Sequence, residues 1–193
     1  VLTEGEYPVR FHFLGLWDTV ASVGAPMSAN TTSPAQPAGW IQVKRAMHNR
    51  NLTGNGVSVL AFGPPGADPA PGGADGHGGW ANGLDVPDMV ETCIHMVAAH
   101  EVRNSFPLDS VRRNHRYPTN AQEMVYPGVH SDVGGGYRAG EGARSHLPGQ
   151  MLSLIPLRAM HKFAWERGVH LEPISGISDP AVQVHYAVDD ESQ

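Results

Sequence analysis

The sequence predicts an α/β domain built around a mostly parallel sheet, and three observations support this class. Strand-like segments alternate with segments of helical periodicity along the chain. The strand candidates are short apolar runs with little alternation, which is typical of parallel strands covered on both faces. The chain has 193 residues, 40% of them hydrophobic, which is enough to bury a sizeable core.

Strand candidates were chosen by their β-branched and aromatic content. The first covers residues 9–17 and ends at Asp18, and the others cover residues 57–62, 123–126 and 182–188. The first of these is the strongest, because it is almost continuously apolar. We therefore expect it to lie inside the sheet.

Three helices are predicted between the strands. A short one covers residues 40–49, and a longer one covers residues 85–104, with Asp85 as its N-cap and Pro87 in its first turn. The last helix covers residues 153–167. An apolar stripe at helical spacing supports the first two, and Pro156 in the first turn with Gly168 just past the end supports the last.

Glycine and proline are abundant, at 23 and 16 residues, and many of them lie in two loops. Residues 24–39 form one loop, and residues 63–85 form a longer insertion of a kind that is usually functional or mobile. Trp80 and Leu84 in this insertion could cover a site or contact lipid, and a disordered surface insertion is the equal alternative. We predict one partial domain over residues 1–193.

The charge and cysteine content exclude several classes of protein. The chain has 13 basic and 19 acidic residues and a net charge of −6, which argues against a nucleic-acid partner. One cysteine rules out a disulfide framework. No apolar run is long enough to span a membrane, and no signal peptide is visible. Because the sequence opens at Val1, we expect it to be part of a longer polypeptide.

Asp18 and His130 are the best candidates for catalysis. Each follows a predicted strand, and ligands of open parallel sheets bind at the carboxyl ends of the strands. In a catalytic triad, a histidine takes the proton of the nucleophile and an acid orients the histidine. The alternatives are that Asp18 is a turn residue or helix cap and that His130, one of 11 histidines, is structural.

The same residues could also support other kinds of chemistry. Asp18, His130 and Asp132 could form a metal site of nitrogen and oxygen ligands, although the spacing alone is weak support. Asp132 also competes with Asp18 for the role of the acid, but an acid two residues from the base would hardly reach its Nδ1. Residues 134–136 are three glycines without the following Lys of a phosphate loop.

Three further histidines are weaker candidates for a functional site. His77 lies in an HGG sequence similar to an esterase oxyanion motif, but that motif normally precedes the nucleophile. His95 and His100 are five positions apart, so on the predicted helix they would lie on different faces. A shared metal is therefore not expected.

The sequence lacks the nucleophile of an α/β-hydrolase. Such enzymes carry Gly-x-Ser-x-Gly, followed along the chain by the acid and then the histidine. The nearest match, VASVG at residues 20–24, lacks the first glycine and follows Asp18. If Asp18 and His130 are the acid and base, the serine lies before Val1.

Three segments in the same order resemble a known family. They are FLGLWDTVASVG at residues 13–24, HxxAxxExRxxFPLD at residues 95–109 and YPGVHSDVGGGY at residues 126–137. Together they resemble an α/β-hydrolase domain family that includes the first class of type VI secretion lipase effectors, which are antibacterial phospholipases. By this resemblance the chain is the C-terminal portion of such a catalytic domain.

The resemblance implies a serine-dependent lipid ester hydrolase similar to phospholipase A. His130 would be the base, Asp18 the acid and an upstream serine the nucleophile, with no cofactor or metal. It further implies a membrane phospholipid substrate and secretion into the periplasm of a target cell from the cytoplasm of the producer. The partners would be the rest of the polypeptide, a secretion-spike protein and an immunity protein. A scaffold without a nucleophile and a metal-dependent phosphoesterase remain the alternatives.

Overall fold

The structure is a computed structural model, and it describes residues 2–4, 7–20, 25–26, 60–61, 85–103, 106, 108–113, 116–141 and 145–188. Contacts divide the chain into two compact units. Unit 1 comprises Val1–Asp18, Val86–Ala99 and Val111–Gln193, and unit 2 comprises Thr19–Asp85 and His100–Ser110. That residues 1–193 form a single domain stays a prediction.

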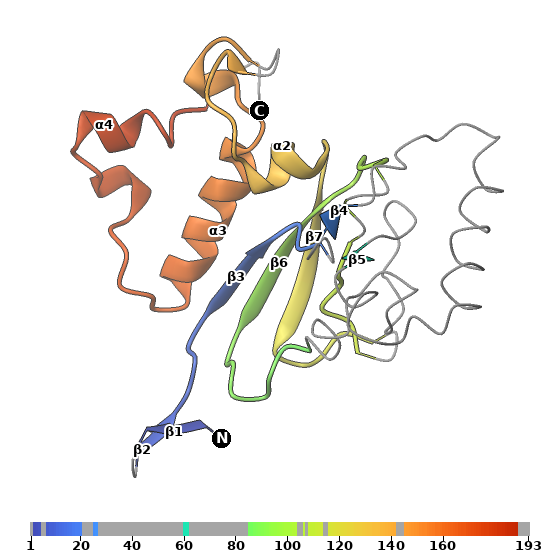
Figure 1. Cartoon of the computed structure of the whole chain (residues 1–193). Helices are drawn as coiled ribbons and strands as arrows, with labels where there is room; N and C mark the ends of the chain where they lie inside the picture. The colour runs from blue at the N-terminus through green and yellow to red at the C-terminus, as the bar shows by residue number, and fades with distance from the viewer. Residues whose placement is uncertain are drawn as a thin grey trace, which may run out of the picture. The chain divides into compact units, whose positions relative to one another are not determined.

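Unit 1 is organised around a parallel sheet of three strands, in the order β3-β6-β7 (Figure 1). The strands are β3 (Leu14–Trp17), β6 (Cys93–Ala98) and β7 (Ala121–Tyr126). Both pairs are parallel, with Cys93 opposite Leu14 on one side and opposite Ala121 on the other. The predicted α/β class and its parallel sheet are confirmed, as are the strands expected around Trp17 and Tyr126.

The central strand β6 corrects the predicted helix over residues 85–104. Its first five residues are buried, because β3 and β7 flank it and side chains cover both faces of the sheet. Such a strand shows no alternation, and its apolar residues can match a helical stripe by chance. Asp85 and Pro87 precede it without starting a helix.

Two apolar clusters lie on opposite faces of this sheet, as alternation along the strands requires. Ile94 and Met96 of β6 pack with α2 and α3, whereas Cys93 joins a cluster with Val111 and Ala121. Burial of a side chain such as Ile94 or Met96, both fully buried, contributes about 1.5–3 kcal/mol. Apolar packing therefore stabilises the sheet on both of its faces.

Helices α2 (His130–Gly134) and α3 (Leu154–Glu166) cover one face (Figure 1). The predicted helix over residues 153–167 is confirmed within a residue at each end. Gly168 follows the C-cap residue Arg167 and has φ +82°, a conformation that suits glycine at a helix end. A short 3-10 helix, η2 (Pro148–Gln150), precedes α3.

The C-terminal segment contains η3 (Ile174–Gly176) and α4 (Pro180–Gln183). The strand predicted over residues 182–188 is wrong. Asp179 caps α4 by accepting a hydrogen bond from the Ala181 amide, and Pro180 occupies the first helical position. This Asp-Pro pair is a helix-start signal that outweighs the local β-branched content.

The remaining strands are short. β1 (Leu2–Glu4) pairs antiparallel with β2 (Tyr7–Val9), so the run predicted as one strand over residues 9–17 joins the central sheet only from Leu14. In unit 2, β4 (Ala25–Pro26) pairs parallel with β5 (Leu60–Ala61).

Several predicted elements lie outside the described residues. These are the helix over residues 40–49, most of the loop over residues 24–39, the strand over residues 57–62 except its pair at 60–61, and the insertion over residues 63–85 except Asp85. No described helix has the length and apolar character needed to cross a membrane.

Candidate active site

Asp18 stands at the carboxyl end of β3, and the sheet itself holds it there. Its amide donates to the Met96 carbonyl at 2.6 Å, and its Oδ1 accepts from the Ala98 amide at 2.7 Å. The residue is 3% exposed and has φ +41°, the single positive φ of a non-glycine residue in the described part of the chain. Such a strained, buried carboxylate differs from an ordinary surface turn residue.

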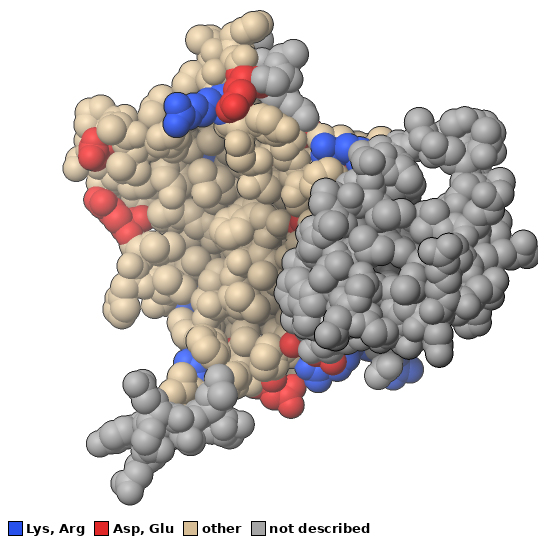
Figure 2. Space-filling model, viewed as in Figure 1, with Lys and Arg blue, Asp and Glu red and all other residues tan. Residues whose placement is uncertain are grey.

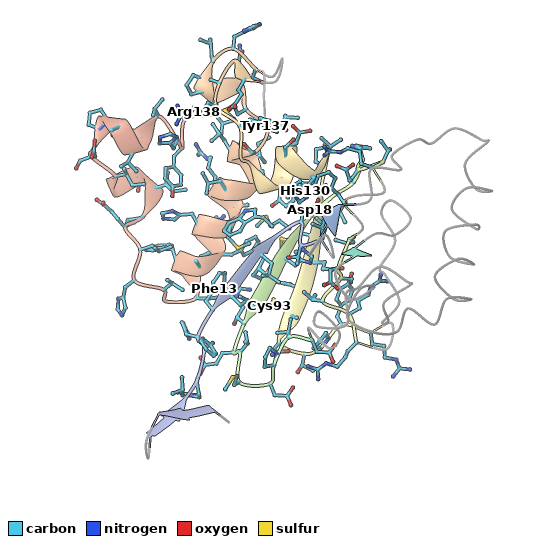
Figure 3. The ribbon with its side chains drawn as sticks, viewed as in Figure 1. Phe13, Asp18, Cys93, His130, Tyr137 and Arg138 are labelled. Atoms are coloured by element: carbon cyan, nitrogen blue, oxygen red, sulfur yellow. The ribbon has the colours of Figure 1, made fainter. Side chains whose placement is uncertain are left out.

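His130 reaches Asp18 from the end of β7, 112 positions away along the chain. The distance from His130 Nδ1 to Asp18 Oδ2 is 2.8 Å, and Figure 3 shows the two side chains together where the strands end. The carboxylate is almost fully buried, whereas 28% of the imidazole side chain is exposed. An acceptor on Nδ1 places the proton of the neutral ring there and leaves the lone pair on Nε2.

The turn that presents His130 is held by Asp132. Asp132 Oδ2 accepts from the Val129 amide at 2.9 Å. Gly128 has φ +111°, and a Cβ placed on it would lie 2.5 Å from the Asp132 Cβ. Glycine is therefore required at this position both by conformation and by space. Asp132 contacts this turn, whereas His130 Nδ1 pairs with Asp18 Oδ2.

Cys93 stands at the opposite end of the sheet from Asp18 and His130 (Figure 3). Burial, with a smaller contribution from the charge of Glu123, raises the pKa of its thiol to about 11. The thiolate is the nucleophilic form of cysteine, so a thiol with this pKa is inert at neutral pH. Cys93 therefore does not supply a nucleophile to the Asp18–His130 pair.

His95 lies on β6 and not on a helix, which corrects the helical reading of His95 and His100. It is fully buried, and its Nδ1 lies 3.0 Å from Glu123 Oε1 on the neighbouring strand. Glu123 also accepts from the Val111 amide and the Tyr117 hydroxyl. This network joins β6, β7 and the segment before β7, which is a structural role for His95.

Glu101 and Arg103, from the second resembling segment, form a local pair in unit 2. Arg103 donates through Nε and Nη2 to the two oxygens of Glu101, at 2.8 and 2.6 Å. The guanidinium also lies over the Phe106 ring, 4.2 Å from its centre. These contacts shape the loop after β6.

The described part of the chain contains no group of three or more His, Cys, Asp or Glu side chains that could hold a metal ion. His77, the residue of the discounted oxyanion motif, lies outside the described residues. The geometry at the sheet end is thus that of an acid and a base joined by one hydrogen bond.

Comparison with known proteins shows the family of the chain. The family described as type VI secretion system phospholipase effector Tle1-like, catalytic domain, matches residues 2–162. The chain belongs to this family. Both Asp18 and His130 lie within the part of the chain that matches the Tle1-like catalytic domain.

One solved structure similar to this Tle1-like chain is a crystal structure of an uncharacterized protein from Pseudomonas aeruginosa. The two are 36% identical, and the TM-score is 0.54. The match covers 61% of this chain and 19% of the other, so this chain spans about a fifth of the solved one. No curated protein matches the sequence.

Part of this site left no signal in the sequence. The Ala98 amide fixes Asp18 through its backbone, which no side-chain pattern records. The clamp by Asp132 did have a signal, since an acidic residue three positions after the start of a turn often accepts from the backbone there. On the sequence alone, Asp132 is only a candidate acid or metal ligand, and the structure gives it this turn instead.

Proposed function

We propose that this chain supplies the acid and base of a serine-dependent phospholipase. The supporting observation is the 2.8 Å contact between His130 Nδ1 and the nearly buried carboxylate of Asp18. This contact sets the tautomer that a general base needs and stabilises the imidazolium that forms. Membership of the Tle1-like family supports the substrate class, a glycerophospholipid ester.

The proposed reaction is acyl transfer. A serine outside residues 1–193 attacks the ester carbonyl as His130 Nε2 takes its proton. The imidazolium then returns this proton to the leaving alcohol, and an acyl-enzyme forms. Water, activated by the same nitrogen, releases the fatty acid. Asp18 stays ionised throughout and holds the ring.

The proposal extends to the biology of the effector. We propose that the substrate is membrane phospholipid, that a type VI system delivers the protein to the periplasm of a target cell, and that an immunity protein protects the producer. The family match supports each of these. A spike protein and the rest of the polypeptide are further proposed partners.

The test uses the full-length protein on phospholipid vesicles and measures fatty acid release. We expect His130→Ala and Asp18→Asn each to lower the rate by roughly 10³-fold or more, as in other triads. Matched controls are His170→Ala and Asp88→Asn, which change exposed side chains of the same types. Controls should keep the wild-type rate.

The outcome also separates the alternatives. Full release by His130→Ala would contradict the proposed base. Loss of wild-type activity on adding a chelator would favour the metal-dependent phosphoesterase. No release by the wild-type protein, with no labelling by a fluorophosphonate probe, would favour a scaffold without a nucleophile.

A further inference from the structure

A cavity of about 230 Å³ lies against α2, the helix that begins with His130. Its lining includes Ser131 and Asp132 of α2, Tyr137, and three residues of the segment leading into α3, namely Ser145, Leu152 and Ser153. Ser131 and Asp132 directly follow His130. One wall of the cavity is therefore formed by the helix that carries the base.

The chemistry of this lining is distinctive. Three serines and a tyrosine supply hydroxyl groups, Asp132 supplies a carboxylate, and no Lys, Arg or His belongs to the described lining. Leu152 and Tyr137 add partly exposed apolar surface. Figure 2 shows the few charged side chains of the described face in view gathered mainly at its edges. A polar, weakly acidic cavity favours a cationic group and disfavours an added anion.

The position suits one part of a phospholipid. When the acyl carbonyl of a glycerophospholipid lies at the catalytic base, the headgroup lies several bonds away on the same glycerol. A cavity whose wall includes the two residues after His130 is near enough to the base to receive that headgroup. The headgroups of common phospholipids differ in their terminal group. Ethanolamine lipids end in an ammonium group, which balances the charge of the phosphate. Glycerol headgroups end in uncharged hydroxyls, so those lipids are net anionic.

We propose that this cavity is the headgroup subsite and that it selects ammonium-bearing phospholipid over net anionic phospholipid. The ammonium lies against Asp132 and the hydroxyl oxygens of the lining. This inference rests on the proposed phospholipase function. It assigns substrate selectivity to residues other than the proposed acid and base.

Full-length protein is given vesicles that contain phosphatidylethanolamine and phosphatidylglycerol in equal amounts, with distinct acyl chains. Mass spectrometry of the released fatty acids gives the ratio of the two rates. Both lipids share one surface, so vesicle binding cancels from the ratio. Hydrolysis of p-nitrophenyl butyrate, which has no headgroup, is measured in parallel.

The main variant is Leu152→Arg, which puts a cation on the cavity wall. Its matched control is Leu171→Arg, because Leu152 and Leu171 are 40% and 39% exposed and Leu171 is not part of the lining. We expect Leu152→Arg to lower the ethanolamine-to-glycerol ratio by roughly three- to tenfold, the effect of about one charged contact. Leu171→Arg should leave the ratio as in the wild type.

Asp132→Asn is the second variant, because its amide oxygen can still accept from the Val129 amide while the charge is removed. Asp132→Asn should also lower the ethanolamine-to-glycerol ratio. If Leu152→Arg fails to fold, Asp132→Asn is the variant that tests the proposal. A wild-type preference for the anionic lipid, or ratios unchanged in both variants, would overturn the subsite. Should the wild type hydrolyse neither lipid nor butyrate, it is the proposed function that fails.

Discussion

At the scale of single residues, two backbone conformations position the base and the acid. Asp18 has a left-handed φ of +41°, which costs a non-glycine residue about 1–3 kcal/mol. Its amide donates to the Met96 carbonyl and its side-chain Oδ1 accepts from the Ala98 amide, and these two hydrogen bonds keep it there. Gly128, with φ +111°, makes the corresponding bend before His130. The strain is thus concentrated where the two side chains must meet.

Replacing Asp132 tests the turn that presents His130. Asp132→Ala removes the acceptor of the Val129 amide, so we expect the free energy of unfolding to fall by about 1 kcal/mol, as for a lost helix cap. Hydrolysis of the butyrate ester should fall roughly tenfold or more, because the base loses its fixed position. Denaturant unfolding and ester kinetics measure the two effects.

Rescue by the conservative change distinguishes positioning from catalysis in this experiment. Asp132→Asn keeps an oxygen that can accept the bond, so most of the ester activity should return. Equal losses in Asp132→Ala and Asp132→Asn would mean that the charge, and not the hydrogen bond, is what matters. Asp179→Ala, which removes the cap of α4 instead, controls for a general loss of stability.

At the scale of elements, His12 joins three segments of unit 1. Its Nδ1 lies 2.8 Å from Glu91 Oε2, just before β6, and its Nε2 lies 2.6 Å from the Arg167 carbonyl at the end of α3. His12 itself precedes β3. These bonds tie the amino ends of two sheet strands to the helix that covers them.

The same contacts predict how stability depends on pH. The hydrogen bond to Glu91 is the largest of the effects that raise the pKa of His12 above 6.5, and the hydrogen bond from His12 lowers the pKa of Glu91 below 4.5. The His12 contribution is therefore full below pH 6.5 and is lost as pH rises through its folded pKa. The Glu91 contribution is present above pH 4.5 and is lost as pH falls.

We expect the NMR titration of the His12 ring to have its midpoint above 6.5 and to move down toward that value in Glu91→Gln. The pair is exposed, so the effect on unfolding should be small. Glu166→Gln is the control. It removes an exposed carboxylate from the residue before Arg167, whose carbonyl contacts His12. A His12 midpoint at or below 6.5 in the wild type would contradict the prediction.

At the scale of the whole molecule, unit 1 brings an acid and a base together, and two features of the chain bear on where their nucleophile lies. Cys93 is protonated at neutral pH and stands at the other end of the sheet. The sequence contains no Gly-x-Ser-x-Gly. The similar solved chain is about five times as long as the part that this chain covers.

We therefore predict that a fluorophosphonate probe labels the full-length protein on a serine outside residues 1–193. Peptide mass spectrometry identifies the labelled residue. Labelling should be much slower in His130→Ala, because the serine then lacks its base. A label on a serine within residues 1–193, at a wild-type rate, would contradict this assignment.

The sequence predicted the class of the sheet, the strands beside Trp17 and Tyr126, and α3, because each shows a pattern that local physics enforces. It predicted a helix where β6 lies, because a strand buried on both faces does not alternate between apolar and polar residues. It also predicted a strand at α4, where the helix-start signal of Asp179 and Pro180 outweighs the β-branched content.

What the sequence by itself determined is the chemistry at two strand ends, an aspartate and a histidine, and the order of the segments that carry them. Only the tertiary structure decided that these side chains meet, 112 positions apart, and that Asp132 holds the turn instead. The physical reason is that parallel pairing through β6 brings the ends of β3 and β7 to one edge. No local pattern encodes that long-range register.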